Sequence, residues 1–180
     1  NKGRCTKKVR YTGPYHVDEF LFVKENANKM IKLPITGAYT LADWSYNEAY
    51  KSKEDFTIDL AKKVIRPLIK DLVKTGADFI QIDEPAATTH PDEMQLVVDS
   101  FNESIKGINA KFGIHICYSG NNYRSLVPAM LDLKIDQIKS VSQRIIDANR
   151  ELQKKQTDLT AIKLAEGNVD ELLAIADLRN

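Results

Sequence analysis

Short apolar runs alternate with longer amphipathic stretches along most of the chain. Strand-like runs occupy residues 32–36, 79–82 and 113–118. Apolar residues that recur every three or four positions predict helices over residues 54–75 and 91–108, and a shorter helix over 123–131. Strands that alternate with helices favour parallel pairing through helical crossovers, so the predicted fold class is α/β.

This order of elements fits either an open α/β sheet or a (β/α)8 barrel, and periodicity alone does not choose between them. A whole barrel takes about 250 residues, whereas three or four units precede residue 137. The sequence begins without a methionine in a polar stretch, so we expect a fragment. Charged and amide residues dominate after Lys139 and predict helix. We therefore predict a partial barrel over 1–137 and a helical tail over 138–180.

The charge and composition of the chain limit the classes of binding partner that it can have. Lys and Arg number 26 and Asp and Glu 25, for a net charge of +1, so nothing marks the chain as a nucleic-acid binder. No apolar run approaches the roughly 20 residues of a membrane span. Two cysteines make no disulfide framework, and we expect a cytoplasmic protein with a small-molecule or protein partner. The open edge of a half barrel predicts self-association.

His115 and Cys117 are the strongest candidate metal ligands. They stand two apart in a predicted strand, so both side chains leave on the same face. One imidazole nitrogen and one thiolate suit Zn²⁺. The alternative is a core histidine beside a thiol that packs as a small hydrophobe. Their place at a strand end favours the metal, because ligands bind at the carboxyl ends of parallel strands.

Asp83 and Glu84 end the preceding strand, and we expect both to open onto the same face as His115. Two carboxylates there could hold a substrate ammonium group, although capping a loop or pairing with lysine is the simpler alternative. Trp44, the only tryptophan, follows the strand at 32–36 in what we read as a loop. It is either a core residue or a stacking face for a planar heterocycle.

Four segments together carry a family resemblance. They are residues 36–45 (TGAYTLADWS), 76–86 (GADFIQIDEPA), 115–118 (HICY) and 131–137 (LDLKIDQ). In this order and spacing the chain resembles, from about Asp18 to Gln137, the catalytic domain of cobalamin-independent methionine synthases, including their short archaeal-type relatives. We expect the tail over 138–180 not to match the family.

The resemblance implies a (β/α)8 barrel that moves a methyl group onto the thiol of homocysteine. It implies that His115 and Cys117 are zinc ligands and that Asp83 binds the amino group of homocysteine. Trp44 would stack on the pterin of methyl-tetrahydrofolate, although some short relatives take the methyl group from a corrinoid protein. Zinc would lower the pKa of the substrate thiol, so that homocysteine is held as the reactive thiolate.

The sequence also departs from the family. In the family, the zinc site takes a glutamate from the strand after the segment LDLKIDQ and a second cysteine from much later in the chain. Neither is found here, because residues 138–141 include no glutamate and no cysteine follows Cys117. The late catalytic histidine of the family is also absent from the 180 residues. Tetrahedral zinc sites need three or four ligands, so we expect this chain alone to be nearly inactive. The alternatives are a corrinoid-linked zinc methyltransferase, a barrel like uroporphyrinogen decarboxylase, and a non-catalytic fragment whose tail mediates association.

Overall fold

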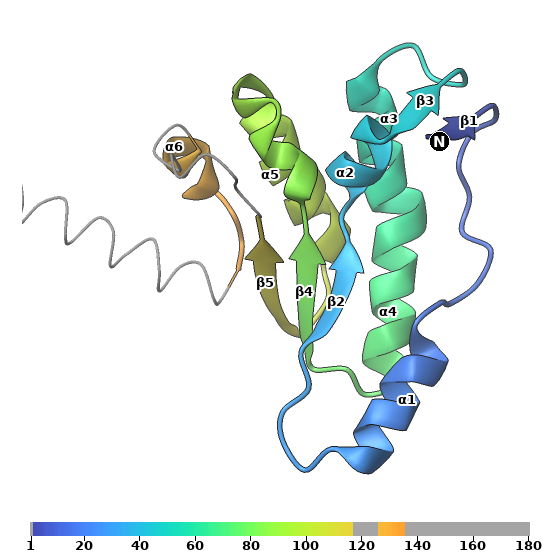
Figure 1. The fold of residues 1–180 in the computed structure, drawn as a ribbon, viewed down its shortest axis with the longest axis vertical. Coiled ribbons are helices and arrows are strands. Elements are labelled where there is room, and N and C mark those ends of the chain that lie inside the picture. Colours follow the sequence, from blue (N-terminus) through green and yellow to red (C-terminus); the bar gives the residue numbers. More distant parts are fainter. Residues whose placement is uncertain (1, 117–125, 136–180) are drawn as a thin grey trace, which may run out of the picture. The chain divides into compact units, whose positions relative to one another are not determined.

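The computed structural model describes residues 2–116 and 126–135 of the chain (Figure 1). Its strands are β1 (Gly3–Cys5), β2 (Leu33–Thr36), β3 (Ser45–Asn47), β4 (Phe79–Asp83) and β5 (Lys111–His115). Its helices are α1 (Val17–Asn26), α2 (Ala38–Asp43), α3 (Lys53–Leu60), η1 (Ala61–Ile65), α4 (Arg66–Lys74), η2 (Pro85–Thr88), η3 (Pro91–Glu93), α5 (Met94–Ile105) and α6 (Val127–Met130).

The central feature is a parallel sheet of three strands in the order β2-β4-β5 (Figure 1). All three predicted strands are found, and the predicted α/β class is confirmed. The bounds predicted for the third strand are displaced, because β5 begins at Lys111 rather than Gly113 and ends at His115, while residues 117 and 118 of the predicted strand lie outside the described residues. Lys111 pairs with Phe79, and its N–H donates to the carbonyl of Asp78 over 2.8 Å. Pairing with β4 therefore recruits two residues that the apolar run does not include.

The two faces of the sheet differ. Successive residues of a strand point to opposite faces, and one face of β2 and β4 buries Ile35, Ile80 and Ile82. These side chains join one core cluster with apolar residues of the long helices, such as Leu68 of α4 and Phe101 of α5. The opposite face carries the polar ends of the strands, so it is the face on which chemistry is expected.

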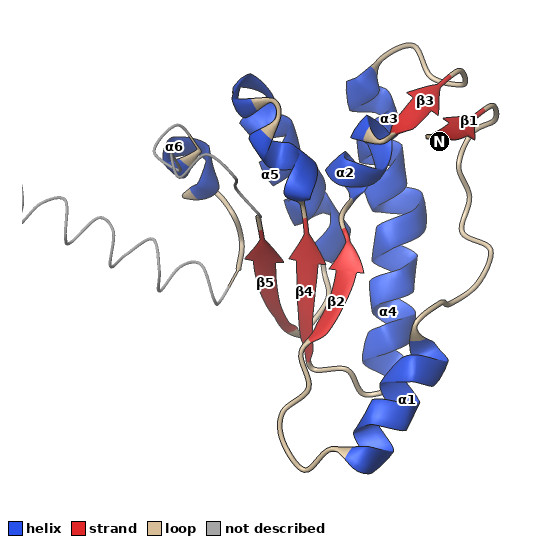
Figure 2. Cartoon of the chain, in the orientation of Figure 1, coloured by secondary structure: helices blue, strands red, loops and turns tan. Residues whose placement is uncertain are grey.

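The helix predicted over 54–75 is present as three consecutive segments, α3, η1 and α4 (Figure 2). The middle segment, η1, is a π-helical turn. Gly76 follows the last turn with a φ of +100°, a left-handed conformation that glycine adopts without steric cost. The helix predicted over 91–108 is found as the short η3 followed by α5.

Three features were not predicted. β1 and β3 pair in parallel over three residues each, which is too short for an alternating pattern to show. In α1 the apolar residues 20–23 are consecutive and only Phe20 of the helix is buried, so the pattern shows no single apolar face. α2 lies where we expected a loop.

Several predictions fall outside the described residues, namely those for Cys117, for the first residues of the helix at 123–131, and for the tail from 138 onward. The boundary at residue 137 and the closure of the sheet into a barrel stay predictions. Among the helices that the structure describes, none combines the length and the apolar character that crossing a bilayer requires.

Candidate functional site

A row of three polar residues lies at the carboxyl ends of the three parallel strands. Thr36 of β2 pairs with Asp83 of β4, and Asp83 pairs in turn with His115 of β5. Residues paired in this way project on the same side of a sheet. His115 and Thr36 are exposed and Asp83 is partly exposed. The structure thus brings Asp83 and His115 together on the side of the sheet opposite the buried isoleucines.

Asp83 is held in place by its own strand. The side-chain amide of Gln81, two residues earlier and therefore on the same face, donates to Oδ1 of Asp83 over 2.7 Å. That contact orients one carboxylate oxygen, and a partly exposed carboxylate can receive an ammonium group through a charge-assisted hydrogen bond.

The expectation that Glu84 opens onto the same face as Asp83 is wrong. Adjacent residues at a strand end point in opposite directions, and the side chain of Glu84 is fully buried. Its two oxygens accept hydrogen bonds from the backbone N–H groups of Tyr39 (3.2 Å) and Thr40 (2.7 Å). Burial raises the pKa of Glu84 to about 7, although the hydrogen bonds from Thr40 and Tyr39 oppose that rise. A direct contact between Glu84 and substrate stays a prediction.

Trp44 does not lie in a loop, as we expected, but ends helix α2. The backbone N–H of Trp44 donates to the carbonyl of Thr40 over 3.0 Å, and 51% of the surface of the residue is exposed. The core alternative for this residue is therefore wrong. An exposed indole at a helix end offers a flat apolar face to a ligand.

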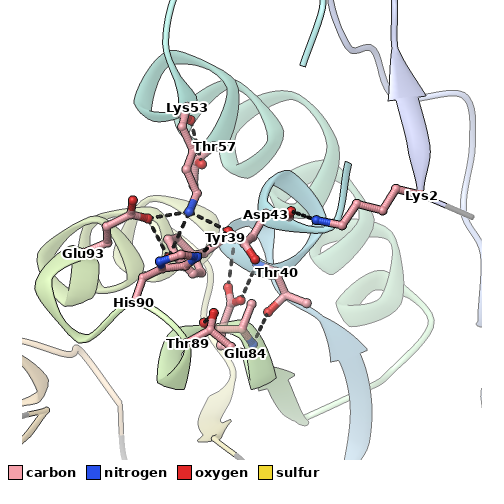
Figure 3. A network of polar contacts seen from close by, with 11 residues as sticks. Lys2, Tyr39, Thr40, Asp43, Lys53, Thr57, Glu84, Thr89, His90 and Glu93 are labelled. Atoms are coloured by element: carbon pink, nitrogen blue, oxygen red, sulfur yellow. Dashed lines mark hydrogen bonds and ion pairs between the residues drawn. The ribbon is translucent and has the colours of Figure 1, made fainter. Parts of the chain in front are cut away.

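A network of charged side chains lies beside α2 (Figure 3). The ammonium group of Lys53, at the start of α3, donates to Asp43 over 2.7 Å, to the hydroxyl of Tyr39 over 3.1 Å and to Glu93. The hydroxyl of Tyr39 donates to Glu93 over 2.6 Å, and Nε2 of His90 lies 3.4 Å from Asp43. The network thus connects α2, α3 and η3.

The network also sets the protonation of its members. Burial would lower the pKa of Lys53, but its hydrogen bonds with Asp43, Glu93 and Tyr39 outweigh burial and raise it. Burial would raise the pKa of Glu93, and the hydrogen bonds from Lys53 and Tyr39 lower it instead. The sequence did not point to these residues, because they lie up to 54 positions apart and no local spacing connects them.

The described residues supply only part of the zinc site that the sequence implies. His115 offers an imidazole at the exposed end of β5, beside the carboxylate of Asp83. Cys117 lies outside the described residues. Within ranges 2–116 and 126–135, no three His, Cys, Asp or Glu side chains gather closely enough to hold a metal ion. One imidazole, with a thiol two positions later in the sequence, fits Zn²⁺ in chemistry but not in number.

Comparison with known proteins gives a consistent result. A family model described as the catalytic domain of cobalamin-independent synthases matches residues 5–159. The methionine synthase of Thermococcus kodakarensis is 49% identical over 138 residues, which cover 76% of this chain and 40% of that protein. The methionine synthase of Thermoplasma acidophilum is 43% identical over 142 residues, covering 75% and 41%. The chain thus spans about 40% of the length of the curated relatives it matches.

Solved structures agree on the fold. A B12-independent methionine synthase from a Shewanella species, solved in complex with selenomethionine, superposes with a TM-score of 0.62 and 25% identity. The match covers 69% of this chain and 41% of that one. A protein from Listeria monocytogenes, described as a vitamin-B12 independent methionine synthase, gives a TM-score of 0.64 at 21% identity over 74% of this chain and 46% of that one.

Proposed function

Because the chain belongs to the family of cobalamin-independent methionine synthases, we propose that it forms part of a centre that transfers a methyl group to homocysteine and yields methionine. One observation carries the proposal, namely that Asp83 and His115 are paired at the carboxyl ends of β4 and β5. In α/β folds this is the edge of the sheet where ligands bind.

The proposed roles follow the chemistry of each side chain. The carboxylate of Asp83 binds the ammonium group of homocysteine, in the orientation that Gln81 gives it. Trp44, exposed at the end of α2, stacks on the pterin of methyl-tetrahydrofolate, the proposed methyl donor. The three-stranded sheet would be part of a (β/α)8 barrel, and the proposed location is the cytoplasm.

His115 and Cys117 are the proposed donors to one zinc ion, which the described residues do not complete by themselves. The remaining donors would come from outside the described residues or from the substrate itself. Zinc bound there would lower the pKa of the homocysteine thiol and so favour its thiolate form.

The same shortage of ligands supports a second candidate from another class, a non-catalytic scaffold. In the part of the chain that the structure describes, no three candidate ligands converge, and the chain spans about 40% of its relatives. In this case the half barrel would serve association rather than methyl transfer.

Zinc binding by the whole chain tests the metal part of the proposal and separates the two candidates. We expect equilibrium dialysis to give one Zn²⁺ per chain, held more weakly than in a complete tetrahedral site. We expect His115→Ala and Cys117→Ser each to abolish that binding. Cys5→Ser is the matched control, because Cys5 ends β1 of the other sheet, where its thiol donates to the carbonyl of Lys7. Zinc binding that survives when His115→Ala and Cys117→Ser are combined would exclude the proposed ligands. If the wild type itself binds no zinc, the non-catalytic scaffold is favoured.

Substituting Co²⁺ for Zn²⁺ allows the ligands of the same site to be tested by absorption spectroscopy. A sulfur-to-cobalt charge-transfer band reports thiolate ligation directly. We expect the band in the wild type and in Cys5→Ser, and its loss in Cys117→Ser. The wild-type band must also sharpen or shift when homocysteine is added if the substrate thiol joins the metal.

A further inference from the structure

The carboxylate of Glu84 connects two parts of the proposed site that come from different segments of the chain. We propose that Glu84 is a positioning residue that fixes helix α2, and with it Trp44, against the strand ends that carry Asp83 and His115. The inference rests on the proposed function in one respect, since it takes Trp44 and the strand ends as two sides of one site.

The first step is that α2 has no cap of its own. A helix begins with backbone N–H groups that lack partners, and a Ser, Thr, Asp or Asn at the N-cap usually accepts from one of them. In α2 the N-cap is Gly37, which has no side chain to do so. Both oxygens of Glu84 take this role, by accepting from the N–H groups of Tyr39 and Thr40. The cap of α2 thus comes from the end of β4, 44 or 45 positions along the chain.

The second step is that the cap requires a glycine at position 37, where a side chain would occupy the place of the Glu84 carboxylate. A Cβ placed on Gly37 would lie 2.0 Å from Oε1 of Glu84, which is far inside van der Waals contact. The carboxylate therefore occupies the space that any other residue at position 37 would fill. Glu84 is also fully buried, so bulk solvent does not reach the N–H groups of Tyr39 and Thr40 that it accepts from.

The third step is that the backbone near Glu84 connects the start of α2 to the strand ends. The N–H of Gly37 donates to the carbonyl of Asp83 over 2.9 Å, and the N–H of Glu84 donates to the carbonyl of His115 over 2.9 Å. The N–H of Ala86 donates to the hydroxyl of Thr40 over 3.3 Å. Glu84 thus lies at the centre of a connection from His115 through Asp83 to the first turn of α2.

The geometry of α2 carries this connection to Trp44. The helix has six residues, so it is only about 9 Å long. Trp44 ends it, bonded to the carbonyl of the same Thr40 whose N–H meets Glu84. A change in the direction of the first turn therefore moves the indole.

The substitution Glu84→Gln tests the proposal in the full chain. Glutamine keeps the shape of glutamate but has one acceptor oxygen, so one of the two N–H groups at the start of α2 would face an amide NH₂. We expect hydrogen exchange to quicken in peptides that cover residues 38–44 while peptides from α5 keep wild-type protection. The emission of Trp44, the only tryptophan, should shift in the same variant. Glu25→Gln, on the exposed surface of α1, is the matched control.

A merely structural role would produce a different result. If Glu84 only contributes to global stability, exchange quickens equally in α2 and α5, and Trp44 emission stays as in the wild type under native conditions. That outcome, or unchanged exchange in α2, overturns the proposal.

A milder pair of variants covers the case in which Glu84→Gln does not fold. Thr40→Val removes the hydroxyl that contacts Glu84 and Ala86 but keeps the backbone N–H, whereas Thr40→Ser keeps both. We expect Thr40→Val to show the faster α2 exchange and the Trp44 shift, and Thr40→Ser to restore wild-type values. Equal behaviour of the two variants contradicts the proposal.

Folate binding separates this proposal from the proposed function. Titration with methyl-tetrahydrofolate should quench Trp44 in the wild type, and we expect about tenfold weaker binding in Glu84→Gln, because a displaced indole must be reordered on binding. Absence of quenching in the wild type would remove the pterin from the proposed function. The exchange and emission results would still decide the role of Glu84.

Discussion

Gly37 and Glu84 are packed so closely that only glycine fits at position 37. A Cβ there would lie 2.0 Å from Oε1 of Glu84 and 2.8 Å from Cγ2 of Ile82. The backbone of Gly37 itself is extended, with a φ of −80°, so an alanine would suffer no backbone strain. We therefore predict that Gly37→Ala lowers the free energy of unfolding by about 2–4 kcal/mol through overpacking and displacement of a buried carboxylate. Urea denaturation measures this.

A double-mutant cycle locates the cause of that loss. In a Glu84→Ala background most of the colliding atoms are gone, although the contact with Ile82 remains. We expect Gly37→Ala to cost at least about 1 kcal/mol less there than in the wild type, because the effects of contacting residues do not add. Strictly additive effects would show that the collision with Glu84 is not the reason.

The ion pair between Lys53 and Glu93 predicts how stability depends on pH. The pKa of Glu93 lies below its ordinary value of 4.5 in the folded protein. A depressed carboxylate pKa stabilises the fold above the unfolded pKa, and this contribution is lost as the pH falls through the folded pKa. The difference in unfolding free energy between the wild type and Glu93→Gln should therefore be constant above about pH 5 and shrink below about pH 4.

Urea titrations of both proteins across this range provide the measurement, with the exposed Glu25→Gln variant as control. Carboxylates that do not contact Lys53 titrate alike in both proteins, so their contributions cancel in the difference. A difference that grows on acidification would contradict the assigned direction of the Glu93 shift.

The ends of the strands could be predicted from the sequence because each strand is marked by neighbouring residues in the chain. The short apolar runs at 79–82 and 113–118 each predict a strand, and parallel strands bring their carboxyl ends together. The α/β class and the neighbourhood of Asp83 and His115 followed from that rule. The exact pairing did not follow, since it depends on Lys111 joining β5.

The role of Glu84 could not be predicted in the same way. Glu84 and the helix that it caps are more than 40 positions apart, and α2 itself begins without a capping side chain. A helix of six residues with no local cap gives no recognisable start signal. For the same reason the sequence predicted a loop at Trp44. Contacts between distant segments decide both features.

Burial separates two phenylalanines that look alike in the sequence. Phe101 of α5 is 1% exposed, and Phe22 of α1 is 68% exposed. We predict that Phe101→Ala costs about 3–5 kcal/mol of unfolding free energy, because it leaves a cavity in the core. Phe22→Ala should change stability by less than about 0.5 kcal/mol. Chemical denaturation of the two variants checks this, and a large loss in Phe22→Ala would mean that α1 is covered in solution.

Asp83→Asn tests the proposed anchor for homocysteine without changing the shape of the side chain. Asparagine can still accept from Gln81, whose amide lies 2.7 Å from Oδ1 in the wild type, so the strand end should keep its geometry. The lost charge removes a charge-assisted bond to the substrate ammonium worth roughly 1.5–3 kcal/mol. We therefore expect calorimetry in the presence of Zn²⁺ to show homocysteine binding weakened by about 10- to 100-fold.

The control for this prediction lies at the other end of the same strand. Asp78→Asn removes an exposed carboxylate just before β4, and its carbonyl contact with Lys111 is unaffected. Homocysteine affinity should therefore equal that of the wild type in Asp78→Asn. A further titration with a homocysteine analogue that lacks the amino group makes the assignment specific, because the wild type and Asp83→Asn should bind that analogue equally. If Asp83→Asn weakens both ligands to the same extent, the carboxylate shapes the strand end rather than binding the ammonium group.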